Sequence, residues 1–165
     1  MSDAQLFEDT FTITSINSQK YDRVSRISCT STDNLTTFTL DINTELYPCA
    51  VGESLSLALA STLSLDGKDE DAAAGRGGWR DVGMGEHTLA NEYDYVCHGK
   101  VYRFEEGSTQ GNMYANNFSS LYPMTNTVIS RSVFVSFGGL LLYMDGPYNK
   151  LVPLRIDYVY LLLKK

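Results

Sequence analysis

The sequence has few of the residues from which metal sites and reactive sites are built. Its 165 residues include only three cysteines and two histidines. No Cys-x-x-Cys pair is present, and no metal-ligand spacing joins cysteine to histidine. We therefore expect no metal site, and we interpret the cysteines as reduced thiols that pack as small apolar residues in an intracellular protein. They are Cys29, Cys49 and Cys97.

Positive charge is also scarce. Thirteen lysines and arginines stand against twenty aspartates and glutamates, which gives a formal net charge of −7. This balance repels polyphosphate, so it argues against nucleic acid as the principal ligand, although a local basic patch stays possible. The chain also lacks a secretory signal and any apolar run long enough to span a membrane, so we expect no membrane contact.

Catalytic motifs are missing as well. There is no Gly-x-Ser-x-Gly elbow and no phosphate-binding Walker loop. Cys97 and His98 are adjacent in a predicted strand, where successive side chains point to opposite faces, and this geometry disfavours a nucleophile–base pair. The acidic cluster between Asp66 and Asp71 lacks the ligand spacing of an EF-hand. The sequence predicts a protein that is not an enzyme.

What the sequence does contain is alternation of apolar and polar residues with a period of two. This pattern is typical of half-buried strands in an antiparallel sheet. Between Tyr21 and Cys29 the pattern slips, because Val24 and Ile27 are three residues apart, and we predict a bulge or bend there. The residues expected on common inner faces include Phe11, Ile13, Phe38, Leu40, Ile42, Leu55, Leu57 and Leu59. Near the end, one strand face carries Ile156, Tyr158, Tyr160 and Leu162, and the other carries Val159, Leu161 and Leu163.

Two long polar segments interrupt the predicted strands. Residues 66–91 carry the acidic cluster and then a glycine-rich stretch, and we expect this loop to be mobile because it has little apolar surface to bury. Residues 107–131 are rich in serine, asparagine and threonine and form a second predicted polar loop. Together these patterns predict an all-β protein: residues 1–165 form a single domain, an antiparallel OB-type β-barrel with two long loops.

The glycine pair Gly138-Gly139 lies within the strand-like run from Ser132 to Met144. A glycine inside a strand costs roughly 0.5–1 kcal/mol relative to alanine, so two in succession need a reason. We interpret the pair as a bulge at a bend of the barrel, close to another chain. The bulge places on one apolar face Val133, Val135, Phe137, Leu140, Leu142 and Met144.

The eleven tyrosines are more than a core of this size needs. Two hypotheses account for them. Aromatic rings on an OB-type barrel can stack on single-stranded bases, and tyrosines at a protein interface are common hot spots. The acidic composition favours the second hypothesis.

Short motifs along nearly the whole chain, outside the two loops, together resemble one family. The chain resembles the small OB-fold subunit, the eighth, that is common to the eukaryotic nuclear RNA polymerases I, II and III. In order, the motifs are Leu6-Phe7-Glu8-Asp9, Tyr21-Asp22-Arg23-Val24-Ser25-Arg26, Leu40-Asp41-Ile42-Asn43, Ala60-Ser61-Thr62-Leu63, Tyr93-Asp94-Tyr95-Val96, Gly99-Lys100-Val101-Tyr102, Ser136-Phe137-Gly138-Gly139-Leu140-Leu141 and Tyr160-Leu161-Leu162-Leu163-Lys164.

The resemblance implies a non-catalytic polymerase subunit in the nucleus, including the nucleolus, that supports assembly and transcription. It implies docking on the largest subunit, no cofactor, and contact with DNA or RNA only through the complex. The alternative is a single-stranded nucleic-acid-binding OB module. Which barrel face docks, and whether the loops become ordered on assembly, stays open. The candidate interface residues are Tyr93, Tyr95, Val96, Tyr102, Phe137, Gly138, Gly139 and Leu140.

Overall fold

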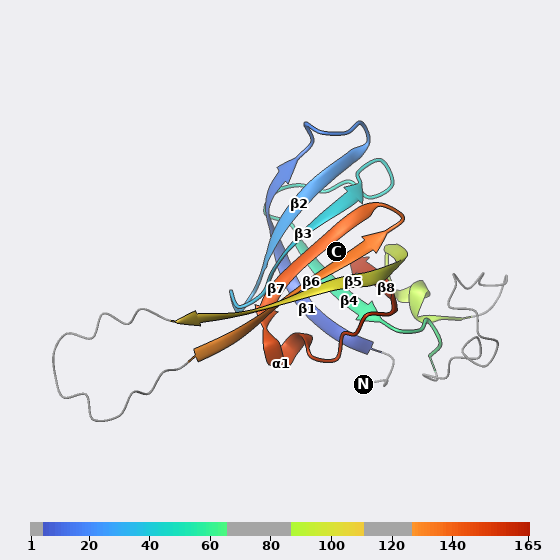
Figure 1. The fold of residues 1–165 in the computed structure, drawn as a ribbon. Helices are drawn as coiled ribbons and strands as arrows, with labels where there is room; N and C mark the ends of the chain where they lie inside the picture. Colours follow the sequence, from blue (N-terminus) through green and yellow to red (C-terminus); the bar gives the residue numbers. More distant parts are fainter. Residues whose placement is uncertain (1–4, 66–86, 111–126) are drawn as a thin grey trace, which may run out of the picture.

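The computed structural model describes residues 5–65, 87–110 and 127–165. Eight strands close into one antiparallel barrel in the order β1-β2-β3-β7-β6-β5-β8-β4 (Figure 1). The predicted all-β, OB-type barrel is confirmed. The strands are β1 (Gln5–Asn17), β2 (Val24–Ser31), β3 (Thr37–Asn43), β4 (Ser54–Ala60), β5 (Tyr95–Gln110), β6 (Thr127–Phe137), β7 (Leu140–Pro147) and β8 (Tyr158–Lys164), with a 3-10 turn η2 (Leu89–Glu92) and a short helix α1 (Tyr148–Leu151).

The alternation in the sequence becomes the inner face of the barrel. All the residues expected on the inner faces of the early strands are buried in one main cluster, which also takes Val159, Leu161 and Leu163 from β8. Phe11 and Phe38 make an edge-to-face contact there, with ring centroids 4.7 Å apart. The inner-face prediction is therefore confirmed for these strands. No helix in the described part of the chain is long and apolar enough to cross a membrane.

Strand β4 from Leu57 onward and strand β8 from Val159 to Leu163 are buried on both faces. Ala58, Ala60 and Leu162 point away from the barrel interior and form a second cluster with Tyr160 and Leu63. Residues from η2 and the adjoining chain, among them Leu89, Ala90 and Tyr93, pack against this cluster. The chain thus covers the outer side of its own β4–β8 wall.

The glycine pair is a hairpin turn rather than a bulge, so that prediction is wrong. Phe137 pairs with Leu140, and Gly138 and Gly139 form the turn between β6 and β7. Their φ angles of 63° and 101° match a type I′ turn, whose twist suits the flanking strands. The predicted common face is nevertheless correct, because direct cross-strand partners share a face in a hairpin: Val135 opposes Leu142, and Val133 opposes Met144.

The predicted bulge near Val24 lies in a neighbouring strand instead. The register between β2 and β3 is unbroken from Val24 to Thr30, and Ser25, not Val24, shares the buried face with Ile27. The extra residue is Thr14 of β1, where the pairing with β2 shifts between Ile13 and Ser15. Of the two alternatives predicted for 21–29, the structure has a bend, which ends at Arg23 with a φ of 64°. The bulge is wrong, and Val24 does not share a face with Ile27 because a small buried serine occupies the inward position.

The strands reach into the second predicted loop. Pairing of β5 with β6 continues from Gly107↔Ser130 to Gln110↔Thr127, so both ends of the segment 107–131 belong to strands. Within the first predicted loop, residues 89–92 form η2. Residues 66–86 lie outside the described residues, and the predicted mobility of that loop stays a prediction.

Gly99 of β5 marks a close approach of two strands. A Cβ atom built on Gly99 would lie 2.3 Å from the Ser136 carbonyl oxygen and 2.5 Å from Cδ1 of Phe137. Only a glycine leaves room here for the ring of Phe137, which closes the barrel interior beside the hairpin turn.

Candidate partner-binding surface

The turn of the β6–β7 hairpin is an exposed backbone surface. Both glycines are exposed, and a Cβ atom built on either would meet nothing within 4 Å. The N–H of Gly139 donates to Oγ of Ser136 over 3.3 Å, which adds a side-chain bond across the turn. The glycines are therefore required by the positive φ angles and not by crowding within this chain.

An aspartate supports the hairpin from the neighbouring strand. The β3–β7 ladder ends at Leu40↔Leu142, and the Leu141 N–H donates instead to Oδ2 of Asp41 over 3.1 Å. Arg26 of β2 donates to both oxygens of Asp41, over 2.7 and 3.0 Å. Three strands are thus tied together just below the turn.

The electrostatics of Asp41 follow from this geometry. Burial alone raises the pKa of the carboxyl, but the Arg26 guanidinium and the Leu141 N–H favour the charged form more, so the pKa lies below its ordinary value. The pKa of Arg26 is raised, chiefly by its hydrogen bond to Asp41. The pair therefore stays ionised at neutral pH.

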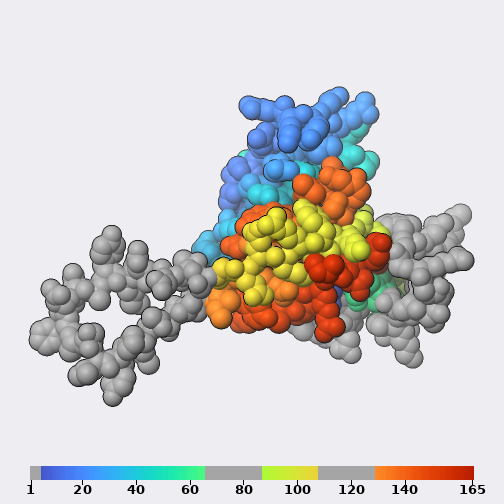
Figure 2. Space-filling model, viewed as in Figure 1, coloured from blue at the N-terminus to red at the C-terminus, as the bar shows by residue number. Residues whose placement is uncertain are grey.

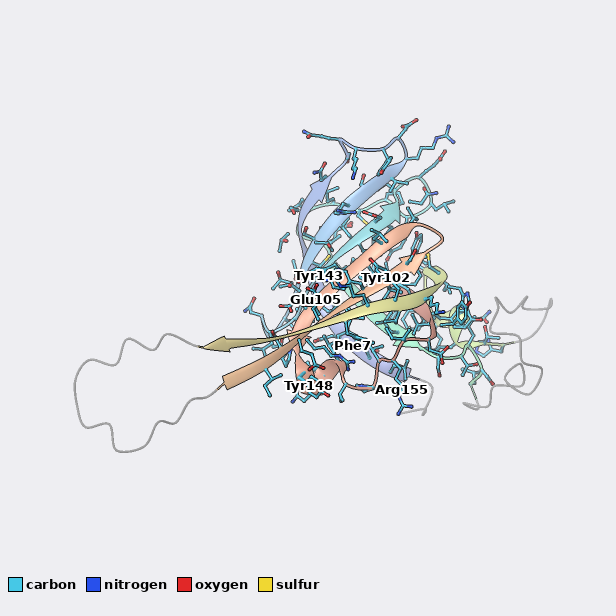
Figure 3. All side chains as sticks on the ribbon, in the orientation of Figure 1. Phe7, Tyr102, Glu105, Tyr143, Tyr148 and Arg155 are labelled. Carbon is cyan, nitrogen blue, oxygen red and sulfur yellow. The ribbon has the colours of Figure 1, made fainter. Side chains whose placement is uncertain are left out.

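Aromatic side chains cover the outer side of β5, β6, β7 and the start of β8. We call this set the outer aromatic face, and it consists of His98, Tyr102, Phe134, Tyr143 and Tyr158. Phe134 lies between Tyr102 and Tyr143, with ring centroids 6.1 and 5.0 Å away, and His98 stacks on Tyr158 at 5.4 Å. Figure 3 labels Tyr102 and Tyr143 on the two strands that flank β6.

Cations lie over two rings of this face. Nζ of Lys100 is 5.4 Å from the Tyr158 centroid, and the Arg103 guanidinium carbon is 5.4 Å from that of Phe134. Tyr102 keeps 47% of its surface exposed, and the yellow atoms of β5 lie at the front of the molecule in Figure 2. The face therefore offers rings and positive charge together, which suits a protein interface.

The interface residues that the sequence predicted fall into an exposed group and a group that this chain buries. Gly138, Gly139 and Tyr102 are exposed and lie at the turn and on the outer aromatic face. The remaining residues are partly or fully buried by this chain. Tyr95, Phe137 and Leu140 pack with the main cluster, and Tyr93 and Val96 pack with the second cluster.

Sequence reasoning missed Asp41, Arg26 and Phe134, and it counted Tyr143 only among the surplus tyrosines. Asp41 and Arg26 lie far apart in sequence, and only the β2–β3 register makes them direct partners. Phe134 and Tyr143 lie in the run around the glycine pair, where the alternation already placed them opposite the inner face. A hairpin with its turn at the glycine pair makes Phe134 and Tyr143 direct cross-strand partners, so recognising the turn would have shown that their side chains are neighbours.

Reactive groups do not gather on this surface. Burial raises the pKa of the Cys29 thiol to about 12, and it raises the pKa values of Cys49 and Cys97 as well. Cys97 packs against the main cluster while His98 lies on the outer aromatic face, so their predicted opposite orientation is confirmed. Among the described residues, no three histidine, cysteine or acidic side chains converge as metal ligands.

A closed barrel with an exposed hairpin turn and an aromatic outer face places the chain in a class of fold, the small OB-type β-barrel. The sequence model of the RNA polymerase Rpb8 family matches residues 8–165. The chain belongs to this family, whose members are non-catalytic subunits of DNA-directed RNA polymerase. The resemblance drawn from the sequence motifs is confirmed.

Relatives match along nearly their whole length. A Schizosaccharomyces pombe protein named DNA-directed RNA polymerases I, II, and III subunit RPABC3 is 35% identical over 165 residues, covering 100% of both chains. The Saccharomyces cerevisiae protein of the same name is 34% identical over 161 residues, 97% of each chain. An Arabidopsis thaliana protein named DNA-directed RNA polymerases II, IV and V subunit 8B is 34% identical, covering 97% of this chain and 95% of its own.

Proposed function

We propose that this chain is a subunit shared by the nuclear RNA polymerases I, II and III, where it docks on the largest subunit. The hairpin turn at Gly138-Gly139 and the outer aromatic face make the contact. The docking supports assembly of the polymerase, and the chain reaches DNA and RNA only through the complex. It acts in the nucleus, including the nucleolus.

One observation carries the choice of surface. The turn exposes backbone with no side chain, and Asp41 and Arg26 hold the strand that follows it. An exposed turn without side chains, held in place from the neighbouring strand, lets a partner backbone come close. Tyr102 would add a contact from the neighbouring face. Tyr93, Tyr95, Val96, Phe137 and Leu140 would act indirectly, by holding the shape of the barrel beneath the contact.

The substitution Gly138→Asn tests this proposal. The φ angle of Gly138 is 63°, which asparagine tolerates, and Asn-Gly is a favoured pair in type I′ turns. The free energy of unfolding should therefore stay within about 0.5 kcal/mol of the wild type. Recovery of the largest subunit with the tagged chain should fall at least about tenfold, because the added side chain occupies the contact.

A matched control is Gly52→Asn. Gly52 also has a positive φ, of 91°, and open space around a built Cβ atom, but it lies in the turn before β4. This variant should recover the largest subunit normally. Normal recovery with Gly138→Asn would show that the turn is not the contact, and loss with both variants would show that the effect is not specific to the hairpin.

A further inference from the structure

Strand β5 has a second neighbour along only part of its length. β8 pairs with it from Tyr95↔Leu163 to Lys100↔Tyr158, and a final backbone bond runs from the Val101 N–H to the Asp157 carbonyl over 3.0 Å. On its other side, β5 pairs with β6 as far as Gln110. Between Tyr102 and Gly107, no described strand lies along the side of β5 that faces away from β6 (Figure 1). We call this stretch the free edge.

The free edge presents the backbone groups that form a sheet. Residues of a strand direct their N–H and C=O groups alternately to either side, so about half of these groups between Tyr102 and Gly107 point away from β6. An extended peptide can satisfy all of them by adding one more strand. The occupant that matches this surface is therefore an extended polypeptide segment.

The free edge is held in a fixed position. The β5–β6 register shifts between Val101 and Arg103, so Tyr102 is an extra residue that ends the closed part of the barrel. Phe104 then packs against the main cluster, with the Arg131 guanidinium carbon 3.8 Å from its ring centroid. An added strand would meet a preorganised edge and would not have to order it first.

Apolar surface surrounds the point where β8 leaves β5. Tyr102 is 47% exposed, Ile156 53% and Tyr158 42%. Tyr158 pairs with Lys100 at the end of the β5–β8 ladder, and Ile156 lies two residues before it, outside the strand. An added strand would cover Tyr102 with an apolar side chain of its own.

The acidic side chains of the free edge favour a basic partner segment. Glu105 has a partner on the same strand, Arg103. Glu106 is exposed and has no ion pair among the described residues. Its cross-strand partner Arg131 lies over Phe104 and donates to the Leu151 carbonyl over 3.2 Å. A lysine or arginine beside Glu106 would supply the missing charge.

We propose that the free edge of β5 takes up an extended segment of another polypeptide of the polymerase, with an apolar residue beside Tyr102 and a lysine or arginine beside Glu106. A second copy of this chain is a poor occupant, because it would bring Glu105 and Glu106 of both copies together and carries the same net charge of −7. The inference rests on membership of a polymerase but not on docking through the hairpin turn.

Amide hydrogen exchange in the purified polymerase tests the added strand. Exchange of the amides between residues 102 and 107 that point away from β6 should be at least about tenfold slower in the polymerase than in the isolated chain, because strand hydrogen bonds protect amides. Equal exchange in both states overturns the proposal. Since the wild-type chain is used, the result is separate from the Gly138→Asn test, in which it is recovery of the largest subunit that changes.

Photo-crosslinking identifies the occupant. With Tyr102 replaced by p-benzoylphenylalanine, we expect a crosslink within the polymerase to a polypeptide segment that contains apolar and basic residues. A crosslink to a second copy of this chain or to nucleic acid overturns the proposal, as does the absence of any crosslink.

A charge reversal supplies the matched comparison. Glu106→Lys should lower the crosslink yield about fivefold, as expected when an attractive pair becomes repulsive. Glu92→Lys makes the same change on the exposed end of η2 and should leave the yield unchanged. Equal yields from the two variants contradict the basic segment.

Discussion

The two walls of this barrel use their outer sides in opposite ways. On the β4–β8 wall the chain covers its own outer side, so Ala58, Ala60 and Leu162 are fully buried in a second cluster. On the β5–β6–β7 wall the outer side keeps Tyr102 and Leu141 exposed, 47% and 39%. Both walls are built from strands with the same inner alternation. The difference shows that covering segments, rather than the strands themselves, decide which wall is left for partners.

The largest expected effect comes from breaking the covered wall. Leu162→Ala removes a fully buried side chain from the second cluster and should lower the free energy of unfolding by about 3 kcal/mol. Leu161→Ala makes the same change one residue away, in the barrel interior. Urea unfolding should give losses within about 1 kcal/mol of each other, since both sites are equally buried. A loss below about 1 kcal/mol for Leu162→Ala alone would contradict a second core.

A smaller effect is expected at the support of the exposed wall. Because the pKa of Asp41 is lower in the folded chain than in the unfolded one, its stabilisation is present above about pH 4 and is lost as the pH falls through the folded value. Asp41→Asn should therefore cost about 1 kcal/mol at pH 7. The gap to the wild type, measured by urea unfolding at several pH values, should narrow in acid.

Asp22→Asn is the control for this pH dependence. Asp22 is an exposed carboxylate, so its substitution should change stability by less than about 0.5 kcal/mol at any of these pH values. A gap for Asp41→Asn that stays constant down to pH 3, well below the ordinary range of a carboxyl group, would show that charge is not what Asp41 contributes.

The smallest effect on stability is expected on the exposed wall itself. Tyr102→Ala should change the free energy of unfolding by less than about 0.5 kcal/mol, because the ring is half exposed and lies beside Phe134 on the outer side of the barrel. Tyr160→Ala, by contrast, removes a ring that is 5% exposed in the second cluster and should cost about 3 kcal/mol. Thermal or urea unfolding measures the free energy of unfolding of both variants. Equal decreases for the two variants would contradict the difference between the walls.

The sequence predicted the inner face of the barrel but not the fate of its outer side. Period two follows from strand geometry, so Phe38, Leu40 and Ile42 could be placed without knowing their neighbours. Whether an outward residue is covered depends on distant segments. Tyr93 and Tyr102 look alike in the sequence, yet only Tyr93 packs with the second cluster, beside η2.

The glycine pair shows how a correct face can follow from a wrong local structure. A bulge and a two-residue turn both bring Phe137 and Leu140 to one side, so the apolar pattern alone does not distinguish them. The distinguishing signal was the pair itself, since two glycines fit the positive φ angles of a type I′ turn. The hydrogen bond from the Leu141 N–H to Asp41 could not be predicted from the sequence, because it depends on the register between β3 and β7.

The strand order also determines when, during synthesis of the chain, the barrel can close. β4 is made early, but the strand that covers its second edge is β8, which pairs with it from Ser56↔Lys164 to Ala60↔Tyr160. Until Lys164 has left the ribosome, Leu57 and Ala58, on opposite faces of β4, both lack the neighbour that buries them. Long-range closure of this kind is slow. The ring around the core can therefore close only after β8 has been made, however early the other strands pair.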